Sequence, residues 1–118
     1  IAGLLERREV FTREEVDTPA VEVESSDPAP LYPDSLYNAG LGGQVEVEFV
    51  VDHLGRPRMD TFGVVASTHP ALTEAVWRTI PIREFVPARR NGVAVAQVVQ
   101  LPFRFEPDRS TAARKPQE

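Results

Sequence analysis

The stretch GQVEVEFVVDHLG, from Gly43 to Gly55, decides the fold that we predict for this chain. Its side chains fall on two faces, an apolar one of Val45, Val47, Phe49 and Val51 and a polar one of Gln44, Glu46 and Glu48. A period of two is typical of a β-strand with one buried and one solvated face. Asp52 and Gly55 then favour a turn, because Asp can bond nearby backbone and glycine tolerates positive φ. The stretch therefore predicts a strand that leads into a hairpin loop.

The flanking sequence predicts helices and strands around this one. Residues 33–40 carry the proline, aspartate and glycine signals of a two-turn helix. A return strand is expected at about 58–66, although its side chains do not indicate which face is buried. Apolar residues at helical spacing predict a second helix over residues 68–80. A last strand is predicted from Val93 to Phe105, and Pro102 favours an edge position for it because proline cannot donate a ladder hydrogen bond.

Length and charge divide the chain into three parts. The 118 residues, 42% hydrophobic and 26% charged, suit one domain and one core. Residues 1–30 hold eight acidic side chains and three basic ones, whereas the remainder holds ten of each. We therefore expect an acidic, proline-containing linker or arm at 1–30, a domain at 31–106 and a disordered tail at 107–118. The alternation of Val21 to Val23 leaves open that the arm docks as a short extra strand.

The composition argues against several functions. A body of balanced charge without a basic stripe gives no footprint for nucleic acid. The chain has no Cys, and its two histidines, His53 and His69, are expected in a turn and at a helix start. Neither a nucleophile with a positioned base nor a metal-binding spacing is present. We therefore predict no enzyme activity, no cofactor and no metal.

The ordered part resembles the TonB C-terminal domain family over residues 31–105. The motifs that carry this resemblance are, in chain order, Tyr32-Pro33, Gly43-x-Val45-x-Val47-x-Phe49-Val50-Val51-Asp52-x-x-Gly55, Ser67 before a helix, Phe85-x-Pro87-Ala88 and Pro102-Phe103-Arg104-Phe105. The resemblance implies an α+β two-layer sandwich, in which a three-stranded antiparallel sheet packs against two helices. One departure is Arg83-Glu84, where the family commonly has an aromatic-basic pair before the residue matching Phe85.

The resemblance also implies a location and a task. The domain would lie in the periplasm as part of an inner-membrane-anchored protein, and the start at Ile1 leads us to expect a piece of a longer chain. It would grip the short TonB box of outer-membrane transporters, while ExbB and ExbD supply the proton motive force through the missing N-terminal region. The alternative is a TonB-like sensing or interaction domain appended to a membrane peptidase or a signalling receptor. Both a monomer and a homodimer are compatible with the resemblance.

The expected mechanism is capture of an extended peptide by strand addition to the edge strand. The residues predicted to bind the partner form one run: Val93, Ala94, Val95, Ala96, Gln97, Val98, Val99, Gln100 and Leu101. A weaker signal adds Tyr32 and Pro33, before the first helix, and Arg89 and Arg90, beside an Asn91-Gly92 turn. For the core, we expect Phe85 as an anchor between the second helix and the sheet, and Trp77 in the core or at its margin.

Overall fold

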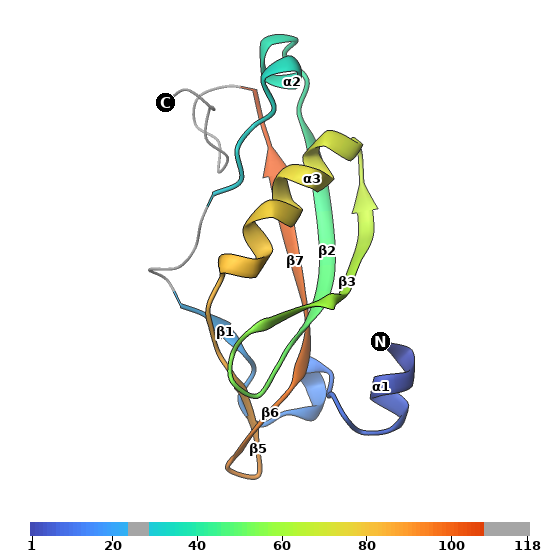
Figure 1. The fold of residues 1–118 in the computed structure, drawn as a ribbon, viewed down its shortest axis with the longest axis vertical. Helices are drawn as coiled ribbons and strands as arrows, with labels where there is room; N and C mark the ends of the chain where they lie inside the picture. The colour runs from blue at the N-terminus through green and yellow to red at the C-terminus, as the bar shows by residue number, and fades with distance from the viewer. Residues whose placement is uncertain (24–28, 108–118) are drawn as a thin grey trace.

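A three-stranded antiparallel sheet in the order β3-β2-β7 forms the centre of the domain (Figure 1). The computed structural model describes residues 1–23 and 29–107. The central strand β2 (Gly43–Val51) pairs with β3 (Pro57–Ser67) on one side and with β7 (Gln97–Phe105) on the other. The fold is the predicted α+β class, and the strand expected from the alternation in residues 43–51 is confirmed.

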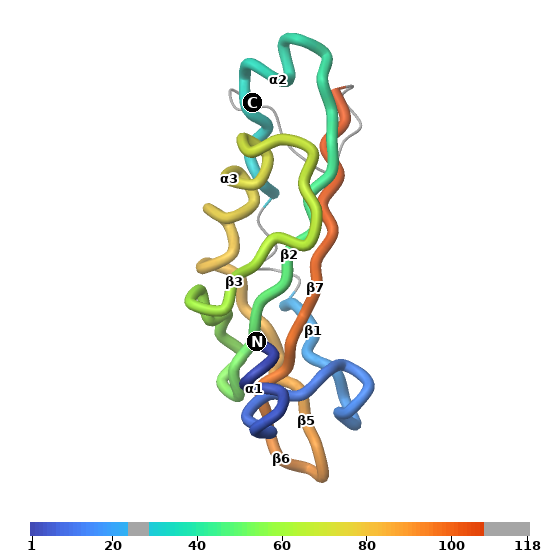
Figure 2. The backbone as a smooth tube through the Cα atoms, turned by 90° about the vertical axis from the view of Figure 1, so that its right-hand side faces the viewer, coloured from blue at the N-terminus to red at the C-terminus, as the bar shows by residue number. Residues whose placement is uncertain are grey.

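One helix covers one face of this sheet, as the side view shows (Figure 2). Helix α3 (Pro70–Thr79) begins with Pro70 in its first turn and is followed by the short 3-10 helix η3 (Ile80–Ile82). The residues of α3 and η3 that face the sheet join the apolar face of β2 in one fully buried cluster, which comprises Leu72, Val76, Ile80, Val45, Val47, Phe49 and Val51. The first predicted helix, α2 (Asp34–Asn38), lies at the end of the sheet instead of on its face (Figure 1).

The loop after β2 holds the chain that follows α3. The Asp52 carboxylate accepts hydrogen bonds from the Leu54 and Arg56 N–H groups, both at 2.9 Å. Gly55 has a φ of 86°, and its carbonyl accepts a hydrogen bond from the Phe85 N–H at 3.0 Å. A Cβ at Gly55 would collide with the Phe85 carbonyl. Gly55 is therefore required both for the turn and for the close approach of Phe85, which is buried as predicted.

The last strand differs from the prediction because it is divided at Ala96. Asn91 and Gly92 both have positive φ, and this tight turn pairs β5 (Ala88–Arg90) with β6 (Val93–Val95) in a small separate hairpin. Strand β7 starts only at Gln97 and is an edge of the main sheet, as Pro102 led us to expect. The expectation of one continuous strand from Val93 was wrong.

The N-terminal arm, which we define as residues 9–23, packs on the domain. It includes the 3-10 helix η1 (Arg13–Glu15) and β1 (Val21–Glu22), and the short helix α1 (Ala2–Glu6) precedes it. Val10 and Phe11 are buried, and β1 pairs with β4 (Phe85–Val86). Residues 24–28 of the predicted linker, and the predicted tail from 108, lie outside the described residues. Trp77 is 48% exposed, so it lies at the margin of the core at most.

Candidate partner-binding edge

The backbone groups of β7 point alternately toward β2 and away from it. The Val50 N–H donates to the Thr61 hydroxyl at 2.8 Å, on the β3 side, so Val50 does not exchange hydrogen bonds with its β7 partner Val98. The N–H of Val98 accordingly points outward, where it donates to the Phe11 carbonyl at 2.9 Å. By this alternation, the outward positions of β7 are Val98, Gln100, Pro102 and Arg104.

The arm already occupies the start of this edge. Phe11 forms a parallel bridge beside Gln97, and its N–H donates to the Ala96 carbonyl at 3.0 Å. The Gln97 side chain, only 3% exposed, donates from Nε2 to the Val98 carbonyl at 3.1 Å. Its Oε1 accepts a hydrogen bond from the Ala20 N–H at 2.8 Å. Both outward groups of Val98 are therefore satisfied by neighbours within the chain.

The second half of the edge is open. Among the described residues, none forms a backbone hydrogen bond to the outward groups of Gln100, Pro102 and Arg104. Gln100 and Arg104 each present a backbone N–H and a carbonyl to a partner, whereas Pro102 presents only its carbonyl. Since the nitrogen of Pro102 points outward, the proline costs β7 no hydrogen bond to β2, which explains how the strand tolerates it.

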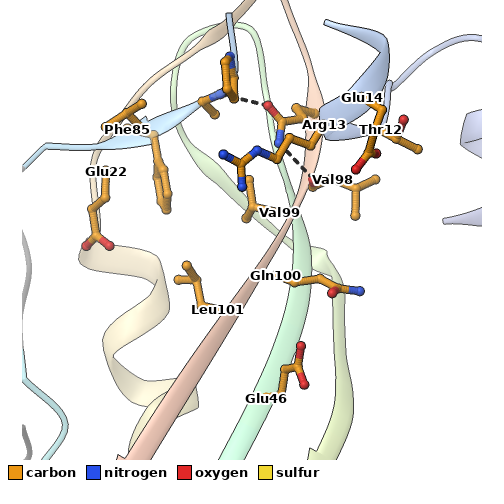
Figure 3. A pocket seen from close by; sticks show the side chains of 14 residues that line it. Thr12, Arg13, Glu14, Glu22, Glu46, Phe85, Val98, Val99, Gln100 and Leu101 are labelled. Carbon is orange, nitrogen blue, oxygen red and sulfur yellow. Dashed lines mark hydrogen bonds between the residues drawn. The ribbon is translucent and has the colours of Figure 1, made fainter.

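A groove of about 660 Å³ runs between the arm and the exposed side of β7 (Figure 3). Residues of the arm form one wall: Thr12, Arg13, Glu14, Pro19, Ala20, Val21 and Glu22. Strand β7 forms the other wall from Gln97 to Leu101, with Phe85 and Glu46 completing the lining. The groove therefore lies beside the part of β7 between Val98, whose outward groups are occupied by the arm and by Gln97, and Gln100, where the open half of the edge begins.

Charges of both signs line this groove. Figure 3 shows the guanidinium of Arg13 reaching into it above Val99, on the side of Phe85, and Arg13 forms no ion pair with another described residue. The Glu22 carboxylate instead binds the buried Arg83 guanidinium at 2.8 Å. Glu14 and Glu46 add two further carboxylates. A mixed charge pattern favours neither a strongly acidic nor a strongly basic ligand, so backbone recognition remains the main means of binding.

The structure brings together only part of the predicted site. Val98, Val99, Gln100 and Leu101 line the groove, whereas Val93 to Val95 belong to β6 and pair with β5. The Ala96 carbonyl accepts a hydrogen bond from the arm, and Gln97 lies in the groove wall but is buried. No sequence signal predicts the arm as a wall of the groove, because its polar composition resembles that of a linker.

The weaker predicted residues have other roles. The buried Tyr32 packs edge-on against Phe105, and its hydroxyl donates to the Leu41 carbonyl at 2.7 Å. Together with Pro33 it lines a second groove of about 460 Å³ beside α3. Arg89 and Arg90 hold the arm: Arg89 pairs through its backbone with Thr18, and the Arg90 Nε donates to the Glu15 carbonyl at 3.1 Å.

Clusters of metal-binding side chains and membrane-spanning helices were both sought among the described residues. Across residues 1–23 and 29–107, His, Cys, Asp and Glu nowhere gather in a group of three that could hold a metal ion. In the same part of the chain, every helix is too short or too polar to cross a membrane.

The sheet covered by one helix, and the outer strand open beside a groove, define a small α+β sandwich domain with an accessible sheet edge. The chain belongs to the family described as the Gram-negative bacterial TonB protein C-terminal, whose model matches residues 28–107. It is also similar to the solution structure of the Pseudomonas aeruginosa TonB CTD, with 25% sequence identity and a TM-score of 0.61. That match covers 76% of this chain and 88% of the other. A search of curated protein sequences finds no match.

Membership in this family gives the domain its general character. The family comprises periplasmic, non-catalytic domains that couple to transport and interact with outer-membrane TonB-dependent transporters. The predicted resemblance and the predicted fold are thereby confirmed.

Proposed function

We propose that this domain grips the TonB box of an outer-membrane transporter by adding it as a strand to the open half of β7. In this proposal the domain transmits the proton motive force of the inner membrane, and contacts with ExbB and ExbD are made by segments outside this chain. The observation that carries the proposal is the set of outward backbone groups at Gln100, Pro102 and Arg104, beside the groove, to which no described residue forms a backbone hydrogen bond. Backbone pairing of this kind captures extended peptides in several other families.

The number of available groups supports a grip that forms and releases readily. Each new backbone hydrogen bond contributes a net of about 0.5–1.5 kcal/mol, and ordering a flexible peptide offsets part of that gain. Five such bonds supply at most about 7.5 kcal/mol before this cost, so a micromolar affinity, equivalent to about −8 kcal/mol, also requires apolar contacts between the peptide and the groove. Such a complex can dissociate and form again in each transport cycle.

A proline substitution at Gln100 tests the proposal. Gln100→Pro removes one outward N–H and no hydrogen bond to β2, a situation that the natural Pro102 already shows to be compatible with the strand. We expect calorimetry to show an affinity for a synthetic TonB-box peptide that is roughly two- to thirteenfold weaker, the loss of one hydrogen bond, while the Tm stays close to that of the parent. The matched control is Gln100→Ala, which keeps the N–H and should bind normally.

The alternatives give different results in the same titration. Equal binding by the proline and alanine variants would rule out strand addition at Gln100. Concentration-dependent dimerisation that is lost with Gln100→Pro, without peptide binding by the parent, would assign the edge to a second copy of this chain. Peptide binding that survives both substitutions would place the transporter site elsewhere.

A further inference from the structure

We propose that the docked arm fixes the register of the added strand, so that pairing starts at Gln100 and cannot extend back to Ala96. This inference rests on the proposed function, because it concerns the same edge. It assigns the arm a role in the binding site, where it acts as a stop at one end of the groove and as one of its walls.

The position of Phe11 provides the stop. Its backbone takes the Ala96 carbonyl and the Val98 N–H, the two groups that an incoming strand would need first. Two guanidinium groups lie over the Phe11 ring, that of Arg8 at 5.1 Å and that of Arg90 at 4.7 Å from its centre. A peptide that reached Ala96 would have to displace this buried ring as well as two hydrogen bonds.

Further contacts fix the rest of the arm along the domain. Thr18 and Arg89 exchange backbone hydrogen bonds of 3.2 and 2.9 Å. The Asp17 carboxylate accepts a hydrogen bond from the Asn91 N–H at 2.6 Å. At the far end, Glu22 forms the ion pair with the buried Arg83. The arm is thus attached at several points to the β5 hairpin and to the segment that enters β4.

The arm does not fill the groove that it borders. Its strand β1 pairs with β4 and not with β7, with Val21 opposite Val86. The groove lies between β1 and β7 and remains open to a ligand (Figure 3). A peptide paired at Gln100 can therefore lie against the arm without displacing it, so loss of the arm should weaken peptide binding. If Val21 to Val23 were instead paired with the edge of β7, the arm would compete with the peptide, and loss of the arm would strengthen binding.

The register also sets the pattern of side chains in the peptide. Peptide residues beside Leu101 and Phe103 would lie on the helix-covered side, next to these half-buried apolar side chains. Residues beside Gln100 and Arg104 would lie on the other face, which carries Glu46 and Glu48. We therefore infer a ligand in which apolar side chains occupy alternate positions.

Disulfide trapping tests the register. The chain has no Cys of its own, so every crosslink must form at the introduced cysteine. Single cysteines at Val98, Gln100, Pro102 and Arg104 share one face of β7, so each is paired in turn with TonB-box peptides that carry one Cys at successive positions. We expect crosslinks at Gln100, Pro102 and Arg104, with the matching peptide position advancing by two residues each time. Val98 should give none.

Substitutions that loosen the arm should allow the peptide to pair further back along β7, beyond Gln100. Arg90→Ala removes the hydrogen bond to Glu15 and one contact to the Phe11 ring, whereas the control Arg89→Ala leaves the backbone pairing with Thr18 in place. We expect crosslinking to extend by two residues, to Val98, with Arg90→Ala and not with Arg89→Ala. Phe11→Ala should produce the same extension and provides an independent second variant. Exchange of the Val98 N–H measures release of the arm directly.

The outcomes separate this inference from the proposed function. No crosslink at any β7 position would overturn the proposed function. Crosslinks at Val98 as strong as those at Gln100 in the parent would leave strand addition standing but show that the arm is no stop. The inference would also be overturned by a variant in which the Val98 N–H exchanges freely but crosslinks still begin only at Gln100. Such a result would leave strand addition itself standing.

Discussion

The two ends of β7 share one strand and one alternation of backbone groups, yet their surroundings differ. At the first end, Phe11 and the Gln97 side chain satisfy Ala96 and Val98. At the other end, no described residue pairs with the outward groups of Gln100 and Arg104. Access to this edge therefore depends strongly on a distant part of the chain, the arm, which occupies one end of β7 and leaves the other end open.

The largest expected effect is on the core that supports both ends. Phe85 is 7% exposed and packs edge-on against Phe49, with ring centres 6.0 Å apart. Phe85→Ala should lower the free energy of unfolding by about 3–5 kcal/mol, since it leaves a cavity beneath the groove. Chemical denaturation measures this loss. A loss below about 1 kcal/mol, the size typical of a surface substitution, would show that the ring is peripheral.

The next largest expected effect is the loss of stability when the ion pair that attaches the arm to the core is removed. Glu22→Ala removes the carboxylate that binds the Arg83 guanidinium, whose side chain is 1% exposed. We expect a loss of about 1.5–3 kcal/mol, the range of a hydrogen bond to a charged group. Glu14→Ala, at an exposed arm position, is the control and should change stability by less than about 0.5 kcal/mol. Equal effects in a denaturation series would mean that the ion pair does not anchor the arm.

Gln97 gives a smaller and more local test of the occupied end. Gln97→Ala leaves the Ala20 N–H and the Val98 carbonyl without their side-chain partner, at about 0.5–1.5 kcal/mol for each hydrogen bond. Amide exchange should rise at Ala20 while Gln100 is unaffected. The sequence predicted Gln97 as part of the partner-binding run, whereas the structure gives its side chain two partners within the chain. A neutral result would show that these two hydrogen bonds do not hold the arm.

The smallest effect is a pH dependence of the arm. A hydrogen bond from the Thr12 backbone, and to a lesser degree the Arg8 charge, lowers the pKa of Glu15 below its usual value of 4.5. A pKa lowered by folding means that this stabilisation is present above pH 4.5 and is lost as the pH falls through the folded-state pKa. The NMR signal of the Val98 amide should therefore shift in acid, and Glu15→Gln should remove this component of the titration.

Elements governed by local signals were predictable from the sequence, as β2 and α3 show. The alternation of β2 and the helical spacing that ends near Pro81 depend on neighbours within a few residues. The face of β3 could not be assigned because Val65 is an extra residue between the pairs Glu46–Ala66 and Val47–Val64, which interrupts the alternation. A second irregularity precedes Val50, where the Thr61 hydroxyl replaces a backbone partner.

The candidate site was predictable only in part, for a related reason. The run Val93 to Val99 alternates in a way that suits a single strand, yet the strand breaks at Ala96, whose carbonyl accepts a hydrogen bond from Phe11, more than eighty positions earlier in the chain. Arg89 and Arg90 looked like an exposed basic turn because their partners, Thr18 and Glu15, are equally remote. Contacts over such distances leave no periodic signal in the sequence.

Pro102 has a further consequence, for the solubility of the domain. An open sheet edge is a template on which copies of a protein can stack into aggregates. The missing N–H at Pro102 interrupts the row of donors, and the charged Arg104 follows two residues later. Two such edges brought together in antiparallel fashion around Pro102 would leave carbonyl groups without donors, which is costly once water is excluded. A single peptide added to this edge would lose one donor at Pro102, whereas two paired copies of the edge would lose one donor each, so Pro102 disfavours self-association more than peptide binding.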